Sequence, residues 1–137
     1  MRYSTHIAEG SMYNTPNTWG IYIVKLICEF LEAQGGVRQI QKINQEKADR
    51  LYRLIDSSSF WRSPVEKESR SIMNVVWRLP TETLEELFLA QAKEAGLTGL
   101  KGHRSVGGIR ASLYNAVSLE AVDALTAFMK EFERKNG

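Results

Sequence analysis

The sequence predicts an α+β domain with a small sheet, with an α/β arrangement as the alternative. Four segments carry apolar residues at helical spacing, and the best strand candidate, residues 72–79, is short, β-branched and aromatic. Strand candidates are separated by helices, and the chain contains no internal repeat or low-complexity segment. Its 137 residues fit one domain and suffice for a real hydrophobic core.

The first third of the chain predicts a lead-in and one unusually apolar helix. Residues 1–16 show no periodicity and hold several turn formers, so we expect an extended or irregular segment. A helix should start at Asn17 or Thr18, both candidate N-caps, and run to Gln34 before two glycines. Its apolar stripe is wider than a surface helix needs, which predicts burial on two sides. In the chain by itself, that stripe should be an exposed patch or should cause self-association.

A second helix is predicted over residues 37–55, and its charge-rich face is interpreted as solvated. The polar residues of that face are Arg38, Lys42, Glu46, Lys47 and Arg50. Residues 60–62 are a candidate short strand that precedes the main strand candidate.

The remaining third should alternate between helix and strand. Pro80-Thr81 opens a helix that ends near Ala95, before a glycine. Residues 97–100 and 109–114 are further strand candidates, and Ser118 is a candidate N-cap for a last helix that ends near Arg134.

Composition excludes several classes of function. A net charge of +2 is too close to balance for binding nucleic acid through overall charge, so any cationic site must be local. The apolar runs fall far short of the roughly 20 residues of a membrane span, and the N-terminus has no signal core, so a cytoplasmic location is expected. Cys28, the single cysteine, is interpreted as a small buried hydrophobe. With one cysteine and only two histidines in the sequence, a structural zinc site is not expected.

Polar chemistry is concentrated between Gly99 and Arg110. Four glycines and a hydroxyl share these twelve residues with four cation-capable side chains, which are Lys101, His103, Arg104 and Arg110. Glycines let a ligand approach the main chain, and arginine suits bidentate contact with carboxylate or phosphate. The segment predicts an anion site for a small ligand with two acidic ends. Glycine-rich basic turns are also common without any ligand, and neither a Walker A loop nor a Rossmann fingerprint is present.

The order of these residues, LKGHRSVGGIRASLYNA, is closely similar to the C-terminal signature of phosphoserine aminotransferases. Residues 11–16 (SMYNTP) resemble the family's S-M-x-N-T-P segment, and residues 70–75 (RSIMNV) resemble its R-S-x-M-N strand. The glycines after Gln34 and the LFL of residues 87–89 follow in the same order. The resemblance covers nearly the whole chain, from about Ser11 to Phe132.

The resemblance implies the C-terminal small domain of a fold-type I, class V aminotransferase dependent on pyridoxal 5′-phosphate (PLP), with a long interdomain helix. The family acts as a homodimer in serine biosynthesis. It converts 3-phosphohydroxypyruvate and glutamate into O-phospho-L-serine and 2-oxoglutarate. Residues 1–16 would then contribute to a PLP site across the dimer, and residues 17–137 would form the small domain with its interdomain helix.

Individual roles follow from the same resemblance. His103 and Arg104 correspond to the pair that binds the substrate phosphate, and Arg110 to the arginine that holds the α-carboxylate. Asn14 and Thr15 correspond to the pair that reaches the PLP phosphate of the other subunit. No metal ligand is implied.

Two departures qualify the match. The family usually has N-T-P-P-T, where this chain has Asn17 in place of the second proline, itself a good helix cap. The Schiff-base lysine, the acidic partner of the pyridine nitrogen and the stacking aromatic precede the N-T-P segment in the family. Lys101 is therefore interpreted as part of the anion site, no catalytic residue is expected in this chain, and the chain alone should not transaminate.

Three hypotheses remain open at this point. The chain is the C-terminal part of an aminotransferase, a stand-alone module that binds phosphate and carboxylate without chemistry, or an interaction module. The interaction module would use its lead-in and first helix to dimerise or to pair with a separate large-domain chain.

Overall fold

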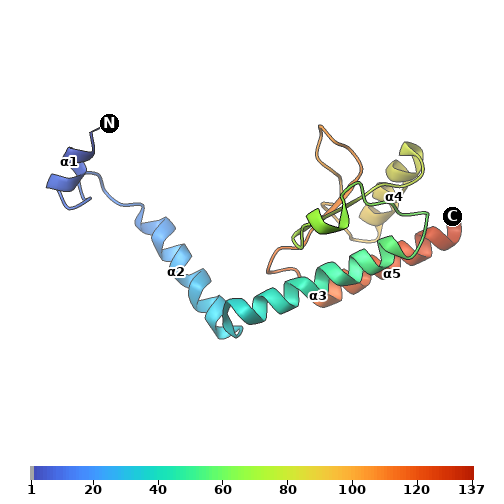
Figure 1. Cartoon of the computed structure of the whole chain (residues 1–137), viewed down its shortest axis with the longest axis horizontal. Coiled ribbons are helices and arrows are strands. Elements are labelled where there is room, and N and C mark those ends of the chain that lie inside the picture. The colour runs from blue at the N-terminus through green and yellow to red at the C-terminus, as the bar shows by residue number, and fades with distance from the viewer. Residues whose placement is uncertain (1) are drawn as a thin grey trace. The chain divides into compact units, whose positions relative to one another are not determined.

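The computed structural model of the chain describes residues 2–137 and separates into two compact units, of which the second is Ile40–Gly137 (Figure 1). The chain forms five α-helices, one 3-10 turn and a two-stranded sheet within the described residues. The predicted α+β class is confirmed. No helix in this part of the chain is both long and apolar enough to cross a membrane.

The first unit holds two helices, α1 (Tyr3–Ala8) and α2 (Thr18–Ala33). The expected irregular lead-in is wrong for residues 3–8, because a helix of six residues is too short to show apolar periodicity in the sequence. The prediction for α2 is confirmed at its start, where the Asn17 side chain accepts a hydrogen bond of 3.0 Å from the backbone of Gly20.

None of the residues of α2 is buried in the chain. The predicted hydrophobic patch is confirmed, since Trp19 is 72% exposed and Phe30 is 55% exposed. The predicted burial of α2 on two sides does not occur within the described residues. The interpretation of Cys28 as a buried residue is wrong for the same reason, because the helix that carries it has no buried face.

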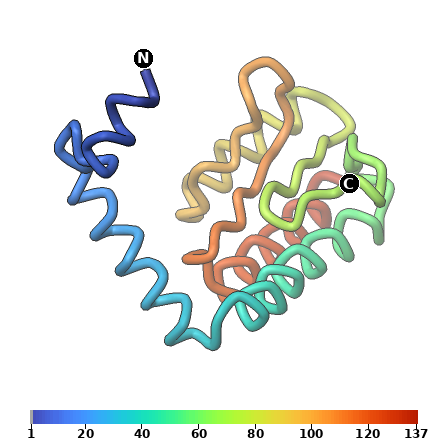
Figure 2. Tube along the Cα trace, turned by 60° about the vertical axis from the view of Figure 1, so that its left-hand side comes forward, coloured from blue at the N-terminus to red at the C-terminus, as the bar shows by residue number. Residues whose placement is uncertain are grey.

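The second unit is built on two long helices, α3 (Gly36–Asp56), whose first turn belongs to the first unit, and α5 (Leu119–Asn136). They lie side by side, as Figures 1 and 2 both show, and Arg50 of α3 contacts Asp123 of α5 at 2.6 Å. The helix α4 (Glu82–Glu94) starts at the predicted position, where the side chain of Thr81 accepts a backbone hydrogen bond of 3.2 Å. Ser118 caps α5 in the same way, also at 3.2 Å.

The sheet is a short antiparallel pair, β1 (Asn74–Trp77) and β2 (Ile109–Ser112). The strand candidates at residues 60–62 and 97–100 are wrong as strands, because each side of the pair is extended by only one bridge. These bridges join Arg62 to Arg78 and Lys101 to Ile109. Besides the five α-helices and the two strands, the described residues hold one further regular element, the 3-10 turn η1 (Lys67–Ser69), which precedes β1.

Alternation along the two strands gives the sheet two different faces. Val75 and Trp77 pair with Ala111 and Ile109, and all four are buried. This face belongs to one hydrophobic cluster, whose members from the three helices are Ala48, Leu51, Leu54, Ile55, Phe88, Ala92, Val122, Leu125, Met129 and Phe132. The opposite, open face carries Arg110, half-buried beside its partner Val76. The cationic side chain of β2 is therefore kept on the side away from the core.

Lys47 corrects the interpretation of the charged face of α3. Its side chain is 0% exposed, and its ammonium donates hydrogen bonds to the carbonyl oxygens of Tyr114 (2.8 Å) and Val117 (3.0 Å). Burial lowers the pKa of this amine below its usual value. The lysine is buried because the turn between β2 and α5 offers two backbone acceptors that need donors. Lys47 thus ties α3 to the segment that follows β2.

Candidate anion-binding site

The glycine-rich segment forms a tight loop that leads into the start of β2. The amide of Gly102 donates to the carbonyl of Gly108 at 2.8 Å and closes the base of the loop, and the amides of Val106 and Gly107 donate to the carbonyl of His103. A Cβ atom on Gly102 would lie 2.1 Å from the carbonyl oxygen of Gly107, so only glycine fits there. The backbone itself therefore fixes the shape of this loop.

His103 and Arg104 stand exposed at the tip of the loop. The Nδ1 atom of His103 lies 2.7 Å from the hydroxyl oxygen of Ser105, which orients the ring. Within residues 2–137, neither side chain forms an ion pair. Two cation-capable groups that point to solvent without an acidic partner are suited to bind an anion.

These residues line a cleft of about 380 Å³ between the loop and α4. The charged side chains around the cleft are Arg78, Glu82, Glu85, Glu86, Lys101, His103 and Arg104. Arg78 is already neutralised, because its Nε lies 2.6 Å from a carboxylate oxygen of Glu85. The lining holds three carboxylates and three full cations, so its formal charges balance. The cation-capable groups that form no ion pair within the described residues, which are Lys101, His103 and Arg104, all lie on or beside the loop.

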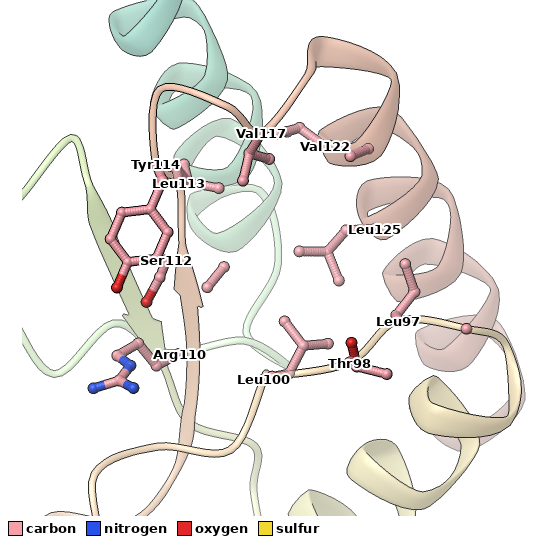
Figure 3. Close-up of a pocket in the computed structure, with 14 residues that line it drawn as sticks. Leu97, Thr98, Leu100, Arg110, Ser112, Leu113, Tyr114, Val117, Val122 and Leu125 are labelled. Atoms are coloured by element: carbon pink, nitrogen blue, oxygen red, sulfur yellow. The ribbon is translucent and has the colours of Figure 1, made fainter. Parts of the chain in front are cut away.

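Arg110 lies on β2, on the open face of the sheet. Its Nε atom is buried and has no hydrogen-bond partner among the described residues. Figure 3 shows the side chains of Arg110, Ser112 and Tyr114 on one side of β2, with Leu100 and Leu125 on the other. A donor buried without a partner is costly, so Arg110 is a residue whose hydrogen bonding is completed by something that this chain does not provide.

The predicted site residues do not all meet in one cleft. His103 and Arg104 share the cleft beside α4, whereas Arg110 lines a different, mostly apolar cleft of about 490 Å³ (Figure 3). Asn14 and Thr15 lie in the first unit, exposed in the segment between α1 and α2.

Two residues around the site were missed at the sequence level. Arg78 and Glu85 form the ion pair beneath the loop, and neither is among the site residues predicted from the sequence. A signal for Glu85 existed, because it lies three residues before Phe88 and seven before Ala92, on the apolar side of α4. An acidic residue in an apolar stripe indicates a buried partner.

The fold and the site together define the class of the protein. An α+β unit that presents a glycine-rich loop with two unpaired cation-capable side chains matches a family model, aminotransferase class-V, over residues 1–125. The chain belongs to the class-V aminotransferase family.

Within that family, the chain is similar to phosphoserine aminotransferases, which confirms the resemblance drawn from its motifs. It is 53% identical to the enzyme of Desulfatibacillum aliphaticivorans over 99% of its own length and 38% of that protein. It is 54% identical to the enzyme of Geobacillus kaustophilus over 97% of its length and 37% of the relative. The chain thus spans just over a third of the length of the curated relatives it matches.

Solved structures give the same result. The phosphoserine aminotransferase of Bacillus circulans subsp. alkalophilus superposes with a TM-score of 0.91 and 46% identity, over 99% of this chain and 38% of that one. The PLP-bound phosphoserine aminotransferase of Trichomonas vaginalis gives a TM-score of 0.83 and 38% identity, over 93% and 37% of the two chains.

Proposed function

We propose that this chain is the C-terminal portion of a PLP-dependent phosphoserine aminotransferase. The complete enzyme would convert 3-phosphohydroxypyruvate and glutamate into O-phospho-L-serine and 2-oxoglutarate, in the cytoplasm and as a homodimer. The observation that carries the proposal is the loop of residues 102–108, which holds part of the family's signature and exposes His103 and Arg104 without an ion pair in the described residues. The similarity to phosphoserine aminotransferases along nearly the whole chain supports it.

Each cationic residue has a separate role in this proposal. His103 and Arg104 bind the phosphate of the substrate, because an exposed imidazole and guanidinium together offer several hydrogen-bond donors to the oxygen atoms of a phosphate group. Arg110 binds the α-carboxylate that all four substrates and products share. The unpaired Nε of Arg110 supports this role, since a bidentate carboxylate would satisfy it.

Asn14 and Thr15 are proposed to hold the phosphate of PLP across a dimer, with residues 1–16 as the segment that reaches the neighbouring subunit. Both residues are exposed, and neither side chain has a hydrogen bond within the described part of the chain, so their donors are free for a phosphate. Asn14 and Thr15 therefore fit a contact with the phosphate of PLP. When bound, PLP supplies the electron sink that transamination requires. The residues of this chain contribute binding and orientation.

The test joins this chain to the N-terminal part of the Desulfatibacillum aliphaticivorans relative and measures transamination in both directions. The chimera should act on phosphoserine, and Arg110→Ala should lower kcat/KM for glutamate and for phosphoserine by similar factors. His103→Ala should affect mainly the phosphorylated substrate. A lost charge-assisted contact costs about 1.5–3 kcal/mol, so kcat/KM should fall roughly 10- to 100-fold in each case. Equal losses for both substrates in the His103 variant would contradict the division of roles.

The exposed apolar surface of α2 favours one alternative, a non-catalytic binding or dimerisation module derived from an aminotransferase. In that case the chimera would be inactive with every substrate. The isolated chain would still bind phosphoserine or self-associate.

A further inference from the structure

Arg78 connects helix α4 to the loop that carries His103 and Arg104. On one side its Nε lies 2.6 Å from an oxygen of Glu85, whose side chain is only 9% exposed. On the other side its Nη1 donates a hydrogen bond of 3.0 Å to the carbonyl oxygen of Val106, at the tip of the loop. The guanidinium therefore spans the distance between a buried carboxylate and the loop backbone.

Glu85 is itself held in place. The oxygen that contacts Arg78 also accepts a hydrogen bond of 3.2 Å from the amide of Leu79, at the end of β1. A carboxylate with two donors on one oxygen has little freedom to turn, so it fixes the plane of the guanidinium that it contacts.

The stem of Arg78 also forms the surface on which the loop backbone lies. Because Trp77 pairs with Ile109, Arg78 lies opposite Gly108 across the sheet. A Cβ atom on Gly108 would lie 2.6 Å from Cδ of Arg78, and one on Gly107 would lie 3.2 Å from its Nη1. Both glycines also have positive φ angles, +76° at Gly107 and +71° at Gly108, which other residues rarely adopt. The two glycines thus let the loop rest directly on the arginine.

We propose that Arg78 is a positioning residue, which holds the loop of His103 and Arg104 in its binding shape through Val106, with Glu85 fixing and neutralising its guanidinium. The effect on the substrate rests on the proposed function. The effect on the loop does not depend on it.

The same contacts support a direct role for Arg78 in binding phosphate less well than a positioning role. Its Nε and Nη1 are already used, and its Nη2 lies 3.9 Å from Glu82, a second acid. Two carboxylates face one guanidinium, so Arg78 adds no net positive charge to the cleft. Lys101, His103 and Arg104 are the cation-capable groups of the cleft that form no ion pair in the described residues.

The first test compares Arg78→Lys with the wild-type chain by amide hydrogen exchange. A lysine keeps the charge beside Glu85 but cannot reach Glu85 and Val106 together, because it lacks the planar fork. We expect the amides of Val106 and Gly107 to exchange at least about tenfold faster, since one charge-assisted contact is lost. The amides of β1 and β2 should be unchanged.

Arg62→Lys is the matched control. Arg62 lies opposite Arg78 in the neighbouring bridge, is exposed, and makes no side-chain hydrogen bond or ion pair within the described residues. It should leave loop exchange unchanged. Glu85→Gln is the second variant. The side-chain carbonyl oxygen of the glutamine still accepts a hydrogen bond from the amide of Leu79, but the negative charge beside Arg78 is lost. The exchange rates of the loop amides should therefore rise by less than in Arg78→Lys. Unchanged exchange at Val106 and Gly107 in Arg78→Lys would overturn the proposal, and so would an equal rise throughout the sheet.

The second test uses the chimera. Arg78→Lys should raise KM for phosphoserine about tenfold, with kcat nearly unchanged and with KM for glutamate unchanged. A loosened loop without this KM effect would refute the role in binding. If the wild-type chimera does not prefer phosphorylated substrates, the proposed function fails, while the exchange result still decides whether Arg78 orders the loop.

Discussion

Replacement of Lys47 by methionine tests the most unusual polar group of the core. Methionine keeps an unbranched, flexible side chain, one heavy atom shorter than lysine, and removes both hydrogen bonds to the carbonyls of Tyr114 and Val117. Two charge-assisted hydrogen bonds represent about 3–6 kcal/mol. The ammonium is buried without a carboxylate partner in the described residues, and its desolvation offsets part of that gain. We therefore expect Lys47→Met to lower the free energy of unfolding by about 2–3 kcal/mol.

Urea and thermal unfolding measure this loss. For a unit of about 100 residues, the melting temperature should fall by roughly 8–12 °C. Lys42→Met is the matched control, because Lys42 is exposed on the same helix and forms no ion pair within residues 2–137. It should change the melting temperature by no more than about 1 °C, as expected for a surface substitution.

The pH dependence gives the sharper result. Burial lowers the pKa of Lys47 in the folded state, so between that lowered pKa and 10.5 the unfolded chain binds more protons than the folded one. The free energy of unfolding of the wild type should therefore rise with pH relative to Lys47→Met across this interval. Other groups titrate in both proteins and cancel in the difference. A difference that shrinks as the pH rises, or a variant as stable as the wild type, would refute the reasoning.

Three further predictions concern other parts of the chain. The exposed apolar surface of α2 should make the isolated chain self-associate or bind a hydrophobic dye, and a monomer by light scattering with no dye binding would contradict this. After addition of PLP, dialysis and borohydride reduction, mass spectrometry should find no adduct concentrated on a single lysine of the isolated chain. Arg70 holds the pKa of Asp56 below its usual value, so the pair's contribution, about 1 kcal/mol, should be present above the ordinary carboxyl pKa and lost as the pH falls through the lowered one. Asp56→Asn should remove that acid-dependent part of the unfolding curve.

Much of the fold could be predicted because its signals are local. Asn17, Thr81 and Ser118 each place a side-chain acceptor three residues before an unpaired backbone amide. The predicted caps at Asn17 and Ser118 and the predicted helix start at Pro80-Thr81 are confirmed. The strand β1 was visible because β-branched and aromatic residues are concentrated there. The sequence motifs of the loop also identified the family correctly.

The errors arose where the decisive contact is distant in sequence. Lys47 follows the pattern of a solvated face, and its partners at Tyr114 and Val117 lie about 70 residues further along the chain. Cys28 lies in an apolar segment, but the helix that carries it has no buried residue within residues 2–137. Arg78 contacts the backbone carbonyl oxygen of Val106. Every residue has such an oxygen, so the amino-acid types in the sequence do not indicate this contact. The assignments of His103, Arg104, Arg110, Asn14 and Thr15 to ligands stay predictions.

The narrowness of the sheet makes the position of Arg110 dependent on a single register. With only four paired positions, Asn74↔Ser112 to Trp77↔Ile109, a deletion of one residue inside β2 would exchange its two faces. The arginine would then point at Trp77 and the helices, and Ile109 would point to solvent. A length change within residues 103–106 leaves that alternation intact. Variation in the reach of the tip is therefore compatible with folding, whereas variation in the strand is not.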